Sequence, residues 1–179
     1  MNNDMLEWSR ACPTVAQDQR EGFDPEAVTV SESVDIAAPA ELVWKILTDL
    51  ERYGEWNPFC VRAVSTLEMG APVWMSLVNY PVPGTLVPNC EFVCAFEPGR
   101  RLAWSFPYTE AWPYPARRDQ ILEPTGAQSC RYVTADAFLG AHGIHVFRFA
   151  GPWIKRAFDD TARALKAHAE RLYTSGAVG

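Results

Sequence analysis

The feature that most constrains the fold is a series of six short segments with strand-like patterning, followed by one long helical segment. The six segments cover residues 60–67, 73–80, 90–97, 101–106, 117–123 and 130–138. Short Pro- and Gly-containing breaks separate most of them, and connections this short are typical of antiparallel hairpins. Residues 152–173 then repeat apolar side chains at helical spacing. An antiparallel sheet must bury its apolar face, and the long helix is its natural cover.

Ahead of these segments lie one more strand and two helical stretches. Residues 28–36 (VTVSESVDI) alternate with a period of two, which places Glu32 on the same face as the four apolar side chains. Residues 39–50 have helical periodicity, and residues 55–58 predict a turn or a second short helix. We therefore expect an α+β fold in which seven curved antiparallel strands grip a long C-terminal helix and leave a cavity. Two short helices would lie between strands 1 and 2.

Composition and charge exclude several classes of protein. A chain of 179 residues that is 48% hydrophobic fits one globular domain, and it lacks the ~18 consecutive apolar residues of a membrane-spanning helix. The net charge is −6, and residues 1–30 carry six acidic and two basic side chains. Because no basic run occurs, we expect neither a nucleic-acid partner nor attraction to an anionic membrane. We interpret residues 1–27 as an acidic extension, weakly ordered or wrapped on the surface, and residues 28–179 as the domain.

Cysteine usage predicts a reducing compartment. The five cysteines are scattered, and no N-x-S/T sequon occurs. Residues 1–10 (MNNDMLEWSR) lack the basic start and apolar core of a secretory signal. We therefore expect a cytoplasmic protein with free thiols. Metal-ligand spacings, phosphate loops and nucleophile elbows are not recognisable, so we expect no metal and no organic cofactor.

Five local strings, in order along the chain, carry a resemblance to a known family. They are VDIAAP (34–39), VWKILTD (43–49), YGEWNPF (53–59), EPGRRLAW (97–104) and LEPTG (122–126). With the element order, they resemble the START-like (SRPBCC) superfamily, and most closely its bacterial polyketide cyclase/dehydrase-like branch. The resemblance covers about residues 28–173 and implies a helix-grip fold, as in Bet v 1-type proteins, with a deep pocket. It fixes no single chemistry, because enzymes, carriers and sensors share this fold.

Polar side chains fall on the strand faces that should line this pocket. If the apolar residues of the last two predicted strands face the interior, the polar residues on the same faces do so as well. These are Arg118, Gln120, Tyr132, Thr134 and Asp136. The resembling topology pairs the first strand with the last, which would add Glu32. We hypothesise that Arg118, Asp136 and Glu32 form an acid–base centre in which Arg118 holds an enolate or carboxylate oxygen. Gln120, Tyr132 and Thr134 would position the ligand. Alternatively, the polar patch merely orients a ligand or meets water at the cavity mouth.

Aromatic side chains, 12% of the chain, are expected to form the walls and lid of the pocket. The remaining expected ligand-binding residues are Trp56, Asn57, Asn79, Phe92, Trp104, Tyr108, Trp112 and Phe158. Residues 106–115 (FPYTEAWPYP) would either close over a planar ligand or fold back on themselves. Trp56 and Asn57 have a structural alternative, as a packing anchor and a turn cap.

Together, the residues and the resemblance favour binding of a hydrophobic, aromatic or polycyclic small molecule. The protein would act on it as a cofactor-independent polyketide cyclase/dehydrase-like enzyme. A non-catalytic carrier or sensor of lipids or quinone-like molecules is the first alternative. A protein-interaction module, docking through the sheet surface or the acidic extension, is the second.

Overall fold

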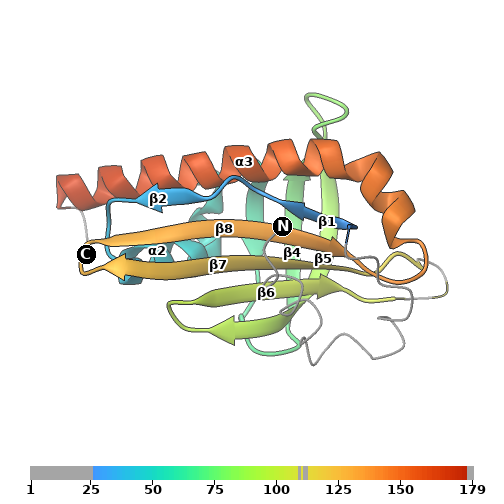
Figure 1. Ribbon diagram of the computed structural model, residues 1–179, viewed down its shortest axis with the longest axis horizontal. Coiled ribbons are helices and arrows are strands. Elements are labelled where there is room, and N and C mark those ends of the chain that lie inside the picture. The colour runs from blue at the N-terminus through green and yellow to red at the C-terminus, as the bar shows by residue number, and fades with distance from the viewer. Residues whose placement is uncertain (1–25, 109, 111–112, 177–179) are drawn as a thin grey trace.

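A computed structural model describes residues 26–108, 110 and 113–176, so the expected extension lies almost entirely outside the described residues (Figure 1). The strands are β1 (Val28–Val30), β2 (Val34–Ile36), β3 (Cys60–Val64), β4 (Pro72–Val78), β5 (Leu86–Glu97), β6 (Arg101–Phe106), β7 (Ala116–Gly126) and β8 (Ser129–Phe138). The helices are α2 (Ala40–Thr48), the 3-10 helix η2 (Leu50–Glu55) and α3 (Gly143–Ser175).

The strands form one antiparallel sheet in the order β1-β8-β7-β6-β5-β4-β3, and β2 also pairs with β8. Helix α3 runs along the sheet beside β1 and β2, while α2 and η2 connect β2 to β3 (Figure 1). Since β1 and β2 are two pieces of one strand, this is the expected helix-grip fold with seven strand positions. Within the described residues, no helix combines the length and apolar character needed to cross a membrane.

The first strand is split, which corrects the predicted face of its N-terminal half. Val30 is opposite Ala135, but Val34 is opposite Tyr132, so the first strand holds one residue more than β8 between these pairs. Ser31 fixes the break, because its amide donates to the Thr134 carbonyl and its hydroxyl accepts the Thr134 amide. An extra residue moves later side chains to the other face. Val28 therefore packs with the outer cluster of the sheet, whereas Val34 packs in the core under α3.

Helix α3 begins nine residues earlier than the sequence predicts, at Gly143 rather than Pro152. Proline commonly starts helices, and this preference misled the prediction. Pro152 instead lies inside α3, where its missing N–H leaves the carbonyl of Arg148 without its helical partner. Figure 1 shows the helix turning away from its main axis at this N-terminal end. Proline is a usual cause of such a bend.

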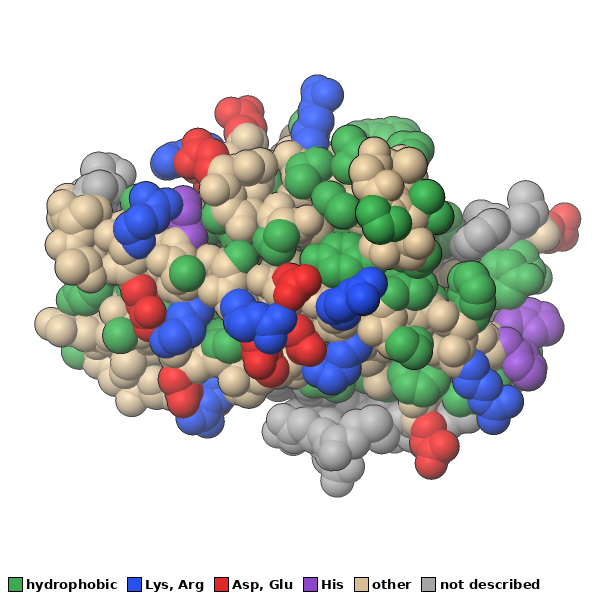
Figure 2. Space-filling view, turned by 90° about the horizontal axis from the view of Figure 1, so that it is seen from above, with side chains coloured by type: hydrophobic (Ala, Val, Ile, Leu, Met, Phe, Trp, Pro, Cys, Tyr) green, Lys and Arg blue, Asp and Glu red, His purple; other side chains and the backbone are tan. Residues whose placement is uncertain are grey.

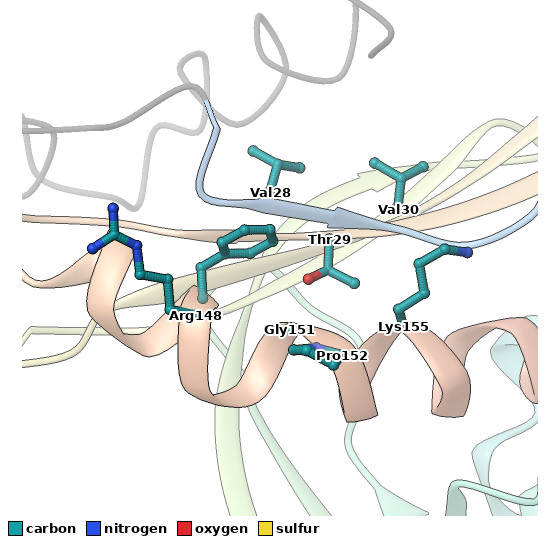
Figure 3. A pocket seen from close by; sticks show the side chains of 8 residues that line it. Val28, Thr29, Val30, Arg148, Gly151, Pro152 and Lys155 are labelled. Atoms are coloured by element: carbon teal, nitrogen blue, oxygen red, sulfur yellow. The ribbon is translucent and has the colours of Figure 1, made fainter.

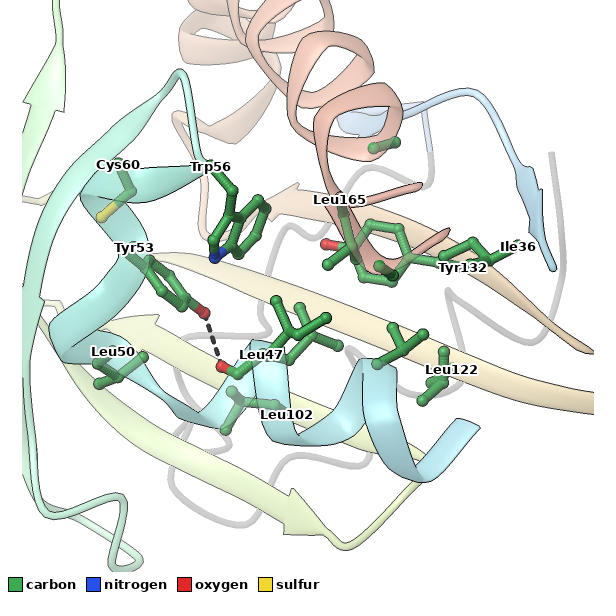
Figure 4. Close-up of a cluster of buried hydrophobic side chains, with 14 of the residues drawn as sticks. Ile36, Leu47, Leu50, Tyr53, Trp56, Cys60, Leu102, Leu122, Tyr132 and Leu165 are labelled. Atoms are coloured by element: carbon green, nitrogen blue, oxygen red, sulfur yellow. Dashed lines mark hydrogen bonds between the residues drawn. The ribbon is translucent and has the colours of Figure 1, made fainter. Parts of the chain in front are cut away.

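The main core lies between α2, α3 and the inner face of the sheet (Figure 4). Leu165 on α3 and Leu102 on β6 are completely buried there. Tyr53 donates its hydroxyl to the carbonyl of Leu47 at 2.8 Å, which ties η2 to α2. Trp56 packs edge-on against Tyr53, with ring centroids 5.2 Å apart. The opposite face of α3 is charged, and Figure 2 shows Lys, Arg, Asp and Glu side chains interspersed along it.

Truncation of Leu165 tests this packing. Leu165→Ala should lower the free energy of unfolding by about 2–5 kcal/mol, because it removes buried methyl groups and leaves a cavity between α3 and the sheet. Urea unfolding followed by circular dichroism measures the change. Phe149→Ala on the same helix is the control, because Phe149 is 81% exposed and its truncation should change stability by less than about 0.5 kcal/mol. Equal stability of the two variants would contradict the described position of α3.

Candidate functional site

The register of the sheet gathers polar residues on the face that α3 covers. Arg118 on β7 is directly opposite Asp136 on β8 and Trp104 on β6. One position pair further along, Gln120 is opposite Thr134. Directly opposed residues of antiparallel strands share a face. Because Trp104 belongs to the core under α3, the residues opposite it face α3 as well.

Arg118 is the central cation of this face and is only 5% exposed. Its guanidinium lies 4.4 Å from the ring centroid of Phe158, and 5.8 and 5.9 Å from those of Phe59 and Trp104. Its Nε donates to the hydroxyl of Thr134 at 3.3 Å. Among the described residues, no carboxylate lies within 4 Å of it, and its Nη2 lacks a hydrogen-bond partner. Aromatic rings stabilise a cation less than a carboxylate does, so this site favours an added anion or partial negative charge.

Two carboxyl groups lie within electrostatic reach of Arg118. Burial raises the pKa of Glu91 to about 8, reinforced by the negative charge of Asp136 and opposed by Arg118. Burial also raises the pKa of Asp136 to about 7, again against the effect of Arg118. Glu91 on β5 is three strands from Asp136, so their interaction reflects the curl of the sheet. Both groups can exchange protons near neutral pH, as general acids and bases require.

Several nitrogen donors inside the protein also lack acceptors. Buried side-chain nitrogens without a partner in the described part of the chain include Trp56 Nε1, Asn57 Nδ2, Trp104 Nε1, Arg118 Nη2 and Gln120 Nε2. The oxygen atoms nearby are already engaged: Gln120 Oε1 accepts from the Tyr132 hydroxyl, and the Thr134 hydroxyl donates to the Asp119 carbonyl. A buried donor without a partner is costly. An acceptor oxygen from water or from a ligand would satisfy each of these donors.

The structure places two predicted residues, Glu32 and Phe92, away from this centre. Glu32 lies in the break between β1 and β2, where its carboxylate pairs with Arg163 at 2.7 Å on the surface. Phe92 is on the outer face and 37% exposed. The phase of β5 changes at an irregularity between Val93 and Ala95, so the apolar alternation predicted the wrong face for Phe92. Asn79 follows the end of β4 and closes the turn to β5, with its amide donating to the Thr85 carbonyl.

Trp56 and Asn57 have the structural roles named as their alternative, a packing anchor and a turn cap. Asn57 is buried, and its Oδ1 accepts the amides of Phe59 and Cys60 at 3.0 and 2.8 Å. Its side chain thus caps the turn that positions Phe59 next to Arg118. Within residues 106–115, which were expected to close over a ligand or fold back on themselves, Tyr108 is 48% exposed, whereas Trp112 lies outside the described residues.

Sequence reasoning missed Glu91 and Phe59. Glu91 is opposite Val73, whose side chain is in the core, and this pairing turns Glu91 inward. On β5 the set Asn89, Glu91 and Val93 is more polar than the alternating set that contains Phe92. Hydrophobic alternation alone therefore predicted that the set with Phe92 faces the interior. Phe59 could have been found from the sequence, since it ends the YGEWNPF string that carries the family resemblance.

In the described part of the chain, no three His, Cys, Asp or Glu side chains group as a metal site requires.

Comparison with known protein families identifies the family of the chain. Residues 27–170 match the family described as "Polyketide cyclase / dehydrase and lipid transport". The match covers most of the chain, which therefore belongs to this family. Membership places it among proteins that handle hydrophobic small molecules. No curated protein sequence matches the chain.

Solved structures share the fold at low sequence identity. An aromatase/cyclase, Zhui, from Streptomyces sp. R1128 has a TM-score of 0.64 at 20% identity, with 85% of this chain and 98% of that chain covered. A START superfamily protein from Mycobacterium smegmatis has a TM-score of 0.61 at 15% identity, with coverage of 81% and 98%. Protein NE0264 from Nitrosomonas europaea has a TM-score of 0.62 at 20% identity, with coverage of 87% and 99%. At these identities the likeness establishes the fold.

The raised pKa of Glu91 predicts how stability depends on pH. The folded protein keeps this proton between the unfolded pKa of 4.5 and the folded pKa of about 8, where the unfolded chain has lost it. Stability of the wild type should therefore fall as pH rises through this range, by up to about 1.4 kcal/mol per pH unit. Glu91→Gln should remove this contribution, so that the variant becomes the more stable protein towards pH 8.

Urea unfolding at intervals from pH 4.5 to 8 measures the difference. Glu123→Gln is the matched control, because Glu123 is an exposed carboxylate on β7. A constant stability difference between Glu91→Gln and the wild type across this range would contradict a half-buried Glu91 that keeps its proton in the folded protein.

Proposed function

We propose that this protein binds a hydrophobic, oxygen-bearing aromatic or polycyclic molecule between α3 and the sheet, and acts on it as a cofactor-independent cyclase/dehydrase. The observation that carries the proposal is Arg118, a buried guanidinium surrounded by aromatic rings rather than by a close carboxylate. Two carboxyl groups whose pKa values burial raises lie near it. This combination suits a reaction in which negative charge develops on oxygen while protons move on carbon.

The surroundings of Arg118 support the proposed ligand class. Phe59, Phe158 and Trp104 offer ring faces and edges to a flat molecule. The unpartnered nitrogens of Trp104, Gln120 and Arg118 offer donors to carbonyl or hydroxyl oxygens. A pure hydrocarbon would leave these donors unpaired, so an oxygenated ligand is favoured over it.

An intramolecular aldol condensation is the reaction that these groups fit. Asp136, in its carboxylate form, would take a proton from the carbon next to a carbonyl whose oxygen is held by Arg118. The resulting enolate carbon would bond to a second carbonyl carbon, and protonated Glu91 would give its proton to the oxygen formed there. Asp136 would then return its proton to that hydroxyl, which leaves as water, while Glu91 takes a proton from carbon. Both groups end in their starting forms.

A non-catalytic carrier of hydrophobic ligands is the alternative. The family description includes lipid transport, and one structural neighbour is titled a START superfamily protein. The neighbour titled an aromatase/cyclase supports the enzyme instead. In a carrier, Arg118 would contribute to affinity in the same way, but Asp136 and Glu91 would have no catalytic task.

Replacement of Arg118 tests ligand binding. The probe is 1,8-dihydroxyanthraquinone, a flat tricyclic molecule with acceptor oxygens, and calorimetry or fluorescence gives its Kd. Arg118→Met should weaken binding roughly 10- to 100-fold, because a charged hydrogen bond contributes about 1.5–3 kcal/mol. Arg62→Met, at an exposed arginine on β3, should leave Kd unchanged. Equal effects of the two variants would exclude Arg118 as the anchor.

Replacement of the carboxyl groups separates enzyme from carrier. The substrate probe is a synthetic tetraketide thioester, whose cyclisation and loss of water create an aromatic ring that absorbs in the ultraviolet. Wild-type protein should accelerate the reaction, and Asp136→Asn and Glu91→Gln should each lower kcat about 10²- to 10⁴-fold with little change in anthraquinone binding. If wild-type protein binds the anthraquinone but does not accelerate ring formation, the carrier is the correct assignment.

A further inference from the structure

A hollow lies outside the Arg118 centre, along the edge of the sheet. It has a volume of about 380 Å³ and lies between β1 and the first turns of α3 (Figure 3). Its lining residues are Val28, Thr29, Val30, Phe147, Arg148, Gly151, Pro152 and Lys155, which we call the β1–α3 groove. This volume falls at the lower end of the range for small-molecule sites, about 300–1,000 Å³.

The floor of the groove depends on Gly151. A Cβ at this position would come within 3.0 Å of the Phe147 ring and 3.4 Å of the Thr29 hydroxyl. The absence of a side chain therefore keeps the space between helix and strand open. Pro152, the next residue, presents its ring to the groove and continues its apolar wall. The chain thus leaves a hollow where a larger residue would fill the contact.

The two cations of the groove differ in their availability. Figure 3 shows Arg148 and Lys155 at opposite ends. Lys155 is already paired, since its ammonium lies 2.8 and 2.9 Å from the two carboxylate oxygens of Asp159. Arg148 is exposed and makes no ion pair with any described residue. The groove therefore has one available positive charge, at the Arg148 end.

Thr29 supplies an independent observation that a polar ligand fits. Its side chain is 3% exposed, and its hydroxyl has no hydrogen-bond partner among the residues described. It lies on the side of β1 that faces α3, since Thr29 is opposite Asp136 in the register. Figure 3 shows this hydroxyl between the strand and the helix. A buried hydroxyl without a partner is costly unless something accepts its proton.

We infer that the β1–α3 groove is a binding site for a small amphiphilic carboxylate. Its apolar chain would lie against Phe147 and Pro152, its carboxylate would pair with Arg148, and an oxygen atom would accept a hydrogen bond from the Thr29 hydroxyl. This site adjoins the proposed cyclase centre, because Thr29 is opposite Asp136, but it requires none of the residues of that centre. It gives the protein a second ligand, of a simpler chemical class than the first.

Octanoate, used below its micelle concentration, is the probe, and octanol is its uncharged counterpart. Two-dimensional NMR on ¹⁵N-labelled full-length protein should show octanoate shifting the amide signals of residues 28–30 and 147–151. Arg148→Gln should weaken octanoate binding at least fivefold and leave octanol binding nearly unchanged. Thr29→Val, which keeps the shape and removes the hydroxyl, and Gly151→Ala, which fills the floor, should each weaken binding at least threefold.

Two control variants make the result decisive. Arg62→Gln removes an exposed arginine far along the sheet, and Arg118→Met removes the interior cation, so both should leave octanoate binding unchanged. Circular dichroism verifies that every variant is folded. The inference is overturned if octanoate shifts no signals in the groove, if Arg148→Gln and Thr29→Val bind it as the wild type does, or if Arg118→Met alone abolishes binding.

Discussion

The structure depends above all on the burial of one face of α3 against the inner face of the sheet. Leu165 and Phe158 are almost completely withdrawn from solvent there, and α2 closes one end of the same core. Burying an aliphatic or aromatic side chain contributes about 1.5–3 kcal/mol. The apolar contacts of α3 can therefore offset the cost of a polar group sealed behind the helix. Along one flank of α3, Lys166 pairs with Glu170, and both side chains also bond the backbone at β2, at the Asp35 carbonyl and the Ala37 amide.

That sealing gives the polar residues their chemistry. Arg118, Asp136 and Glu91 would have ordinary properties on an exposed strand. Behind α3, Arg118 has ring faces as neighbours, and burial raises the pKa of both carboxyl groups toward neutrality. Arg118 therefore keeps its positive charge without forming a close ion pair with either carboxyl group. A site of this type stabilises developing negative charge on a ligand better than a site already neutralised by its own side chains.

Hydrophobic alternation predicted the inner faces well where strands are regular. On β7 and β8 it gave the correct neighbours for Arg118 and Asp136, because their pairing continues unbroken through that region. It failed at two irregularities. The extra residue after Val30 leaves Glu32 in the break between β1 and β2. The register shift between Val93 and Ala95 places Glu91 on the inner face of β5, where the alternation predicted Phe92. A single inserted residue inverts every later side chain on a strand, and nothing in the local pattern announces it.

The sequence by itself determined the order of the elements, the helix-grip fold and the family, because these follow from periodicity, turn residues and local strings. It also determined that Arg118 and Asp136 face the interior. The tertiary structure decided which second carboxyl group joins them, since Glu91 reaches Asp136 only through the pairing of β5 with β4 and the curl of the sheet. It likewise decided that a groove remains between β1 and α3, since Gly151 and Thr29 are 122 positions apart in the chain. Such contacts depend on register and close approach, which are properties of paired elements and not of either segment alone.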